Sequence, residues 1–226
     1  MRTFQNRRDA GRKLAQRFDH LSGRPDVVVL ALPRGGVPVA YEVATRIGAP
    51  LDVLVVRKLG VPGHAELAMG AIASGGILVA DQRILAATGV TREAFAAVER
   101  RERAELERRE RVFREGMPPL DVKGKTVIVV DDGLATGATM AAAVDALRTR
   151  DPARVVVAVP VASPDICEAL GRRADEMVCL VTPYPLYAIG LWYEDFTQTT
   201  DEDVRALLGA AREARKPEDA VARTAR

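Results

Sequence analysis

Strand-length apolar runs alternate with helical stretches along most of the chain, and this alternation constrains the fold more than any other feature. Helical stretches separate five such runs, which are DVVVLALP at 26–33, LDVLVV at 51–56, TVIVVDD, RVVVAVP and MVCLV. Continuous apolar runs are typical of strands buried on both faces, and strand–helix–strand repeats form parallel βαβ units. The sequence therefore predicts an α/β fold with a doubly wound, mainly parallel sheet flanked by helices.

Composition excludes several classes of protein. The chain has 226 residues, of which 48% are apolar and 28% charged, and it shows neither a repeat nor a clear linker, so we expect a single domain over residues 1–226. Its 33 basic and 31 acidic residues leave a formal charge of +2, which gives no reason to expect nucleic acid. Cys167 and Cys179 lack metal-ligand spacing. Met1 is followed by charges, and no apolar run approaches membrane-spanning length. We therefore expect a reduced, cytoplasmic protein away from the membrane.

Three segments stand outside the alternating pattern. Residues 6–21 have apolar side chains at helical spacing, with Asn6 as a candidate cap, and residues 214–226 are expected to be a loose tail. Thr91 opens a highly charged helix that runs to about Arg114, an insertion over roughly residues 91–115. Its acid-before-base pairs four residues apart favour a solvated, self-stabilised helix. A basic contact for RNA or a partner subunit is the alternative, although the interspersed glutamates cancel the field that it would use.

The segment after the second apolar run is punctuated by glycine and proline. LGVPGHAEL follows Arg57 and Lys58, and two short strand-like runs, MGAIA and ILVA, come next around Ser74-Gly75-Gly76. This pattern predicts a mobile loop and then a hairpin.

Residues 127–140 read VIVVDDGLATGATM and carry the clearest chemistry of the chain. The loop after this strand leads into a helix, so its amides and the helix dipole form an anion site, with hydroxyl donors from Thr136 and Thr139. The small residues Ala135, Gly137 and Ala138 let a phosphate approach the backbone. Asp131 and Asp132 precede the loop and can accept hydrogen bonds from a vicinal diol, so the motif predicts a ribose 5-phosphate moiety. A P-loop lysine and G-x-G-x-x-G are both missing, and helix capping by an aspartate explains only one of the two acids.

VIVVDDGLATGAT resembles the signature by which type I phosphoribosyltransferases bind 5-phosphoribosyl 1-diphosphate (PRPP), and the order of strands and loops agrees over roughly residues 26–190. The resemblance implies that Asp131 and Asp132 contact the ribose hydroxyls and that Ala135 to Thr139 hold the 5-phosphate. Gly133 departs from the family, which usually has an aliphatic residue there. We expect this glycine to loosen the strand exit without removing a ligand.

The resemblance implies further sites around the pyrophosphate of PRPP. The turn Arg34-Gly35-Gly36 would offer backbone amides, and the basic pair Arg57 and Lys58 would lie at the end of the next strand. Residues 59–74 would form the family's flexible loop, in which His64 and Glu66 are candidates to contact pyrophosphate or Mg²⁺. Mg²⁺ would be bound mainly through PRPP, with Asp131 or Asp132 as a candidate ligand. An ordinary turn, surface charges and solvated loop residues remain the alternatives.

The acceptor is less constrained. The 6-oxopurine branch of the family usually has an aspartate where this chain has Ala135, and a lysine after the next strand, where this chain has VAVPVASPD. Both differences argue against hypoxanthine or guanine, and the alanine resembles the adenine branch. A hood built from residues 1–22 and 183–200 would recognise the acceptor. Its segment PYPLYAIGLWYEDF holds five of the chain's ten aromatic residues, and Tyr187 and Trp192 are the candidates for stacking on a flat ring, with packing at the sheet end as the alternative.

These features together predict a phosphoribosyltransferase that uses PRPP and Mg²⁺, transfers ribose 5-phosphate to a nitrogen of a nucleobase-like acceptor and releases pyrophosphate. Asp131, Asp132, Arg57 and Lys58 would be its catalytic residues. A non-catalytic regulatory protein that senses PRPP, or a simple binder of phosphate monoesters, are the alternatives. The sequence leaves the oligomeric state open between a monomer and a homodimer, although many members of the family dimerise.

Overall fold

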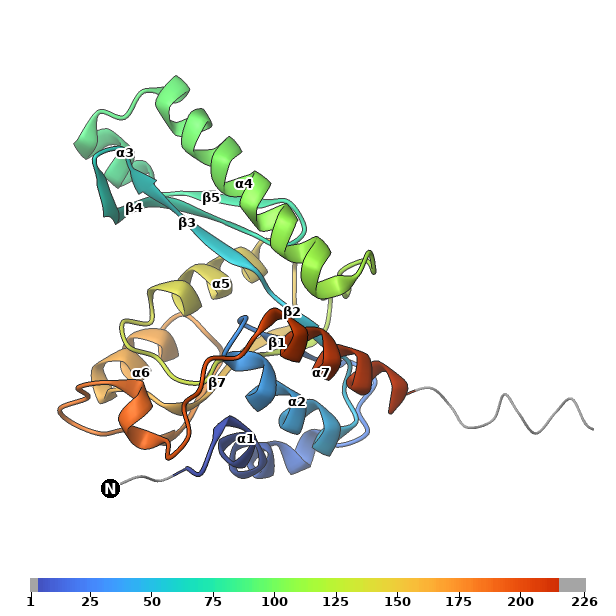
Figure 1. The fold of residues 1–226 in the computed structure, drawn as a ribbon. Helices are drawn as coiled ribbons and strands as arrows, with labels where there is room; N and C mark the ends of the chain where they lie inside the picture. Colours follow the sequence, from blue (N-terminus) through green and yellow to red (C-terminus); the bar gives the residue numbers. More distant parts are fainter. Residues whose placement is uncertain (1–3, 216–226) are drawn as a thin grey trace, which may run out of the picture.

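The computed structural model describes residues 4–215 and contains a five-stranded parallel sheet at its centre. The strand order is β2-β1-β6-β7-β8, and every neighbouring pair is parallel. Helices cover both faces (Figure 1), so the predicted α/β fold class is confirmed. The strands are β1 (Val27–Ala31), β2 (Leu51–Val53), β6 (Thr126–Val130), β7 (Arg154–Val161) and β8 (Glu176–Val181).

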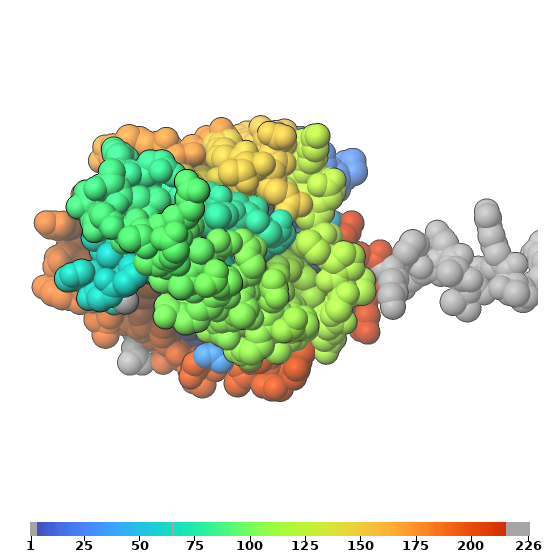
Figure 2. Space-filling view, turned by 90° about the horizontal axis from the view of Figure 1, so that it is seen from above, coloured from blue at the N-terminus to red at the C-terminus, as the bar shows by residue number. Residues whose placement is uncertain are grey.

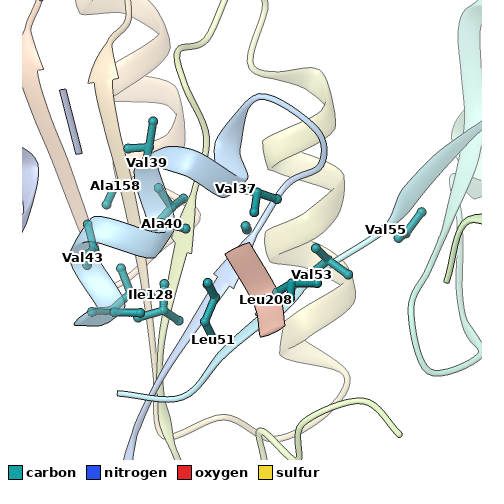
Figure 3. Close-up of a cluster of buried hydrophobic side chains, with 14 of the residues drawn as sticks. Val37, Val39, Ala40, Val43, Leu51, Val53, Val55, Ile128, Ala158 and Leu208 are labelled. Carbon is teal, nitrogen blue, oxygen red and sulfur yellow. The ribbon is translucent and has the colours of Figure 1, made fainter. Parts of the chain in front are cut away.

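The apolar runs form strands because both faces of the sheet are buried. Along β1, Val27 and Val29 point into one core cluster and Val28 and Leu30 into the other. Figure 3 shows the first cluster, where side chains of α2 face the sheet and meet Leu208. The helices around the sheet are α1 (Arg7–Ala15), α2 (Gly36–Ile47), α5 (Ala138–Arg148), α6 (Pro164–Gly171) and α7 (Asp201–Glu213).

Local signals set the limits of these helices. The Asn6 side chain accepts a hydrogen bond from the Asp9 N–H at 3.0 Å and caps α1, as predicted. The predicted helix over 6–21 continues past α1 as a 3₁₀ helix, Gln16–Leu21. Gly48 ends α2 with a positive φ of 70°, a conformation that glycine adopts without strain.

A second, three-stranded antiparallel sheet consists of β3 (Val56–Val61), β4 (His64–Ala73) and β5 (Ile77–Ala80). The predicted hairpin of MGAIA and ILVA is confirmed, with its turn at Gly75 and Gly76. Residues 59–74, predicted as a mobile loop, instead form strands over most of their length, and Pro62 and Gly63 make a tight turn between two of them. The LDVLVV run also divides, since β2 ends at Val53 and Val56 already belongs to the second sheet.

The predicted charged helix is confirmed as α4 (Arg92–Arg114), capped by the Thr91 side chain. It follows a short helix, α3 (Gln82–Thr88), and lies along the second sheet, so that seen from above it crosses the middle of the molecule (Figures 1 and 2). The helix is less solvated than expected, since Val98, Leu106 and Phe113 are buried beneath it.

The predicted ion pairs along α4 are partly present. Glu99 pairs with Arg103 at 2.6 Å and Glu105 with Arg109 at 2.8 Å, and Glu110 pairs with Arg114. The fourth pair, Glu107 with Arg111, does not form within the described part of the chain. Local charge pairing therefore supports the exposed side of α4, while apolar contacts dock its other side.

A buried ion pair joins the two ends of the segment that lies outside the parallel sheet. Arg114 Nε lies 3.0 Å from Asp52 Oδ1, and both side chains are at most 5% exposed. Arg114 also donates to the Val53 carbonyl at 2.6 Å, and the Leu120 N–H donates to Asp52 Oδ2 at 3.1 Å. We call this group, Asp52, Arg114, Val53 and Leu120, the clasp. It fixes the chain where it leaves the parallel sheet after β2 and where it returns.

Neither end of the chain lies within the described residues. Residues 1–3 of the predicted hood and residues 216–226 of the predicted tail lie outside the described residues, and α7 precedes that tail. Across residues 4–215, none of the helices has the length and apolar character that crossing a membrane requires.

Candidate active site

Two largely buried aspartates stand at the carboxyl end of β6, in the middle of the parallel sheet. Asp131 and Asp132 follow Val130 directly, and the Asp132 N–H donates to Asp131 Oδ1 at 2.8 Å. In parallel sheets this edge is where loops gather and ligands bind. The strand therefore presents both acids at the position expected for a binding site.

The electrostatics of this pair are unfavourable in the free protein. Burial raises the pKa of Asp131 well above its ordinary value, and the neighbouring Asp132 charge raises it further. Burial also raises the pKa of Asp132, although the Arg7 guanidinium opposes this shift. Two acids in so dry a place are costly to stability, which is typical of groups retained for binding or catalysis.

The turn after β1 lies directly against the acids. A Cβ atom added to Gly35 would lie 2.0 Å from Asp132 Oδ2, and one added to Gly36 would lie 2.7 Å from the Val130 carbonyl oxygen. Glycine is therefore required at both positions by the close approach. The Arg34 and Gly35 amides donate to no group within residues 4–215, while Arg34 Nη1 lies 3.6 Å from Asp201. The predicted turn and the predicted acids thus form one site with free N–H donors.

The loop after the acids exposes another set of free amides. Ala135, Thr136, Ala138 and Thr139 are exposed at the start of α5. Across the described residues, the amides of Ala135, Thr136, Gly137 and Thr139 have no hydrogen-bond acceptor, and the Ala138 N–H makes only a 3.4 Å contact to Thr136 Oγ1. These N–H groups and the helix dipole of α5 can hold an anion.

Gly133 has a different role from the one expected. It is buried, and an added Cβ would lie 2.6 Å from Ile189 Cγ2 and 2.9 Å from Val161 Cγ1. The expectation that this glycine loosens the strand exit is wrong, because the 3₁₀ helix Ile189–Trp192 packs tightly on it. An aliphatic side chain at this position would push that segment away.

The structure separates the two residues of the basic pair. Arg57 and Lys58 lie within β3, so they do not follow the end of a parallel strand as expected. Arg57 donates to Glu102 of α4 at 2.9 and 2.5 Å. Lys58 points the other way, and with Ala138 it lines a cavity of about 510 Å³ between the second sheet and α5. Only Lys58 therefore shares a cavity with the anion-binding loop.

His64 and Glu66 lie near the tip of the β3–β4 hairpin, and both are exposed. Neither side chain makes a hydrogen bond or an ion pair in the described part of the molecule. The structure therefore does not bring these two residues together with the aspartates.

The predicted hood is assembled from both ends of the described chain. Phe4 pairs with Tyr193 in a parallel bridge, and the Phe4 N–H donates to the Trp192 carbonyl at 3.0 Å. Tyr187 is 84% exposed, and Trp192 is half-buried among apolar hood residues. Tyr187 is thus open to solvent, whereas Trp192 contributes to packing.

Sequence reasoning missed two residues that touch the acids. Arg7 Nε donates to Asp132 Oδ2 at 2.7 Å, and the Tyr193 hydroxyl donates to the Asp132 carbonyl at 2.5 Å. Burial raises the pKa of that hydroxyl far above its ordinary range. Arg7 was one of several arginines in an amphipathic helix and Tyr193 one of five clustered aromatics, so no local signal singled out either residue.

The carboxylates of Asp131 and Asp132 are the type of ligand that the expected metal, Mg²⁺, prefers. Carboxylate oxygens suit Mg²⁺, which usually takes one or two carboxylates and completes its shell with phosphate oxygens and water. Within residues 4–215, no three histidine, cysteine, aspartate or glutamate side chains gather into a metal site.

Known proteins share both the sequence and the architecture. The phosphoribosyl transferase domain family matches the chain over residues 4–180. Two proteins of Mycobacterium tuberculosis, from strains CDC 1551 and H37Rv, are 50% identical to it over 211 residues, and both are named provisionally as phosphoribosyl transferases. These alignments cover 93% of this chain and 47% of each relative, so the chain spans about half the length of these curated relatives.

A solved structure agrees over nearly the whole chain. The crystal structure of TT1426 from Thermus thermophilus is 47% identical and superposes with a TM-score of 0.82, covering 92% of this chain and 98% of that chain. The extent of these matches, together with the motif at the end of β6, shows that the chain belongs to the phosphoribosyl transferase family.

Proposed function

We propose that this protein is a phosphoribosyltransferase that uses PRPP and Mg²⁺ and transfers ribose 5-phosphate to a nitrogen of a nucleobase-like acceptor, with release of pyrophosphate. The observation that carries the proposal is the contact between the Arg34-Gly35-Gly36 turn and the acids Asp131 and Asp132. Free amides therefore flank a pair of carboxylates on two sides, from this turn and from residues 135–139.

PRPP matches this arrangement group by group. Its 5-phosphate would bind the amides and hydroxyls of residues 135–139 at the start of α5. Its ribose hydroxyls would donate to Asp131 and Asp132, and its pyrophosphate would lie at the amides of Arg34 and Gly35. Both anion-binding segments adjoin the acids, because the turn touches them and residues 135–139 follow them closely along the chain.

The reaction breaks the bond between C1 of the ribose and the pyrophosphate oxygen, whose electron pair leaves with pyrophosphate. Positive charge then develops on the sugar, and the carboxylates of Asp131 and Asp132 stabilise it electrostatically. The acceptor nitrogen donates its electron pair to C1 from the opposite face and loses its proton to solvent. The chain needs no covalent intermediate, and its role is to position the donor and stabilise charge.

The leaving group requires cations. Mg²⁺, when bound, neutralises charge on the pyrophosphate. Lys58 is the member of the basic pair that we expect to assist, because it faces the cavity beside Ala138. Arg57 is instead engaged by Glu102, and we expect it to act at the pyrophosphate only if that ion pair opens.

The donor assignment is tested by calorimetry with PRPP and Mg²⁺, compared with ribose 5-phosphate alone. We expect PRPP to bind at least about tenfold more tightly, because the turn at residues 34–36 contributes only to the pyrophosphate. Equal affinity for the two compounds would refute the assignment of the pyrophosphate residues.

Turnover is tested by measuring pyrophosphate release from PRPP with each nucleobase and with small amines. We expect release with at least one purine or pyrimidine, and the exposed Tyr187 and the absence of an acid at Ala135 favour adenine-like bases among them. If the protein binds PRPP tightly but releases no pyrophosphate with any of the acceptors tested, it is a sensor of PRPP and not an enzyme.

A further inference from the structure

Arg7 is held by three different contacts at the point where the hood meets the acids. Its Nε donates to Asp132 Oδ2 at 2.7 Å, and its Nη1 donates to the Thr197 carbonyl at 2.6 Å. The guanidinium carbon lies 3.8 Å from the centre of the Phe196 ring. The Arg7 and Asp132 side chains are 12% and 13% exposed, so this ion pair is largely shielded from water.

These contacts fix one oxygen of the carboxylate. Asp132 Oδ2 accepts from Arg7 and also lies against the Gly35 backbone, since a Cβ added to Gly35 would lie 2.0 Å from it. The planar guanidinium sets direction as well as charge, and its contact with the Phe196 ring favours this position. Arg7 thereby orients the Asp132 carboxylate, whose oxygens can accept from a hydroxyl donor.

The rest of the residue is fixed through its backbone. The Tyr193 hydroxyl donates to the Asp132 carbonyl at 2.5 Å, and the Tyr193 and Phe196 rings lie 4.9 Å apart. Asp132 therefore accepts hydrogen bonds from the hood at two points, at its carboxylate from Arg7 and at its backbone carbonyl from Tyr193. Both groups belong to the hood, so the hood reaches the donor side of the site as well as the acceptor side.

We propose that Arg7 is a positioning residue for the donor sugar: through its ion pair with Asp132 it holds the carboxylate in the orientation that recognises the ribose diol. This role of Arg7 rests on the proposal that PRPP is the donor, and it adds selectivity for the ribose hydroxyls of that donor. Arg7 does not touch the sugar itself, so its loss affects recognition of the hydroxyls more than recognition of the phosphate. Phe196 contributes indirectly, because its ring contacts the guanidinium of Arg7.

The test compares two ligands that differ by one hydroxyl, ribose 5-phosphate and 2-deoxyribose 5-phosphate. The wild-type protein should bind the ribose compound at least about tenfold more tightly, the usual worth of one buried hydrogen bond to a charged group. In Arg7→Gln the affinity for the ribose compound should fall until the two ligands bind within about twofold of each other. A role in folding alone would weaken both ligands equally and leave the ratio unchanged, and that result would overturn the proposal.

A matched control lies one residue away. Arg8 is on the same helix, donates to Glu42 at 2.6 Å and lies 5.1 Å from the centre of the Tyr41 ring, but it does not contact the acids. Arg8→Gln should keep the wild-type ratio. Phe196→Leu, which retains both charges, should reduce the ratio partway, and it provides the test if Arg7→Gln does not fold. A wild-type ratio in Phe196→Leu would also count against the proposal.

The two proposals fail in different ways. If wild-type protein binds neither PRPP nor ribose 5-phosphate, the proposed donor is wrong. If it binds both and discriminates against the deoxy sugar, and Arg7→Gln discriminates equally well, the donor stands and the role of Arg7 is wrong.

Discussion

Glycines define the shape of the site at the scale of single residues. Gly35 and Gly36 allow the turn after β1 to touch the acids, and Gly133 allows the 3₁₀ helix of the hood to pack on the strand exit. In each case the missing Cβ makes room for another atom. The family resemblance identified the turn from its place after a strand, whereas the packing on Gly133 depends on Ile189, 56 positions later in the printed sequence.

Replacing Gly35 by alanine should therefore damage the site specifically. Its Cβ would lie 2.0 Å from Asp132 Oδ2, so the carboxylate must move away from Arg7. We expect affinity for PRPP, measured by calorimetry, to fall at least about tenfold. Gly209→Ala is the control, because that glycine lies within α7 with no atom within 4 Å of the added Cβ. It should keep the affinity and gain about 0.5–1 kcal/mol of stability. Unchanged affinity in Gly35→Ala would contradict the contact.

Replacing Asp132 by asparagine should separate activity from stability. Asparagine keeps the shape of the side chain and removes the charge that stabilises the developing cation, so we expect pyrophosphate release to fall by about a hundredfold or more. The thermal midpoint should move by only a few degrees, because removal of a buried charge offsets the loss of the pair with Arg7. Asp19→Asn, at an exposed pair with Arg46, should leave turnover unchanged. Wild-type turnover in Asp132→Asn would remove the motif from the mechanism.

At the scale of secondary-structure elements, the periodic apolar runs predicted the core strands and helices correctly. The glycines and prolines of residues 59–74 suggested a loop where the structure has strands. The core strands β1, β6, β7 and β8 and the helices between them appear where the apolar runs and glycines indicated. Residues 59–74 were expected to be a loop because glycine and proline are frequent there. In the structure, Leu59, Val61 and Met69 are buried against α4, and this long-range contact makes strands of the segment.

The ion pair between β3 and α4 should give stability a dependence on pH. Burial alone would raise the pKa of Glu102, but hydrogen bonds from Arg57 and Arg101 outweigh it and lower that pKa below the ordinary value of 4.5. The stabilisation is therefore fully present above pH 4.5 and is lost as the pH falls through the lower folded value.

Urea unfolding of Glu102→Gln and wild type from pH 3 to pH 7 checks this. The difference in free energy of unfolding should be largest at neutral pH and should shrink toward the acid end. Glu107→Gln, at an exposed position of the same helix, should show no such trend. If the difference in free energy of unfolding instead grows as the pH falls, burial outweighs the ion pairs and the ionised Glu102 side chain destabilises the fold.

At the scale of the whole molecule, the clasp ties the end of α4 to β2 of the parallel sheet. Asp52 and Arg114 lie 62 residues apart in sequence and are both buried. Sequence analysis could not find this pair, because a single aspartate in an apolar run and the last arginine of a charged helix are each unremarkable alone. Only the folded chain brings them together.

Replacing Arg114 by methionine should be strongly destabilising. The change keeps most of the volume and leaves the Asp52 carboxylate buried without its cation, which costs about 3–5 kcal/mol in comparable cases. Equilibrium unfolding in urea measures the loss. Arg108→Met, which removes an exposed arginine of the same helix, should change the free energy of unfolding little. A small loss in Arg114→Met would show that water or another cation compensates.

The clasp also bears on the order in which the chain folds. Residue 27 of β1 pairs with residue 126 of β6, so the central strand pair needs closure of a very long stretch of chain. A chain in which Arg114 has already met Asp52 has brought the return point, Leu120, next to β2. Only residues 121–125 then separate that point from β6. The clasp thus acts as a noncovalent crosslink: once it has formed, only this short stretch remains to be closed before β6 can pair with β1.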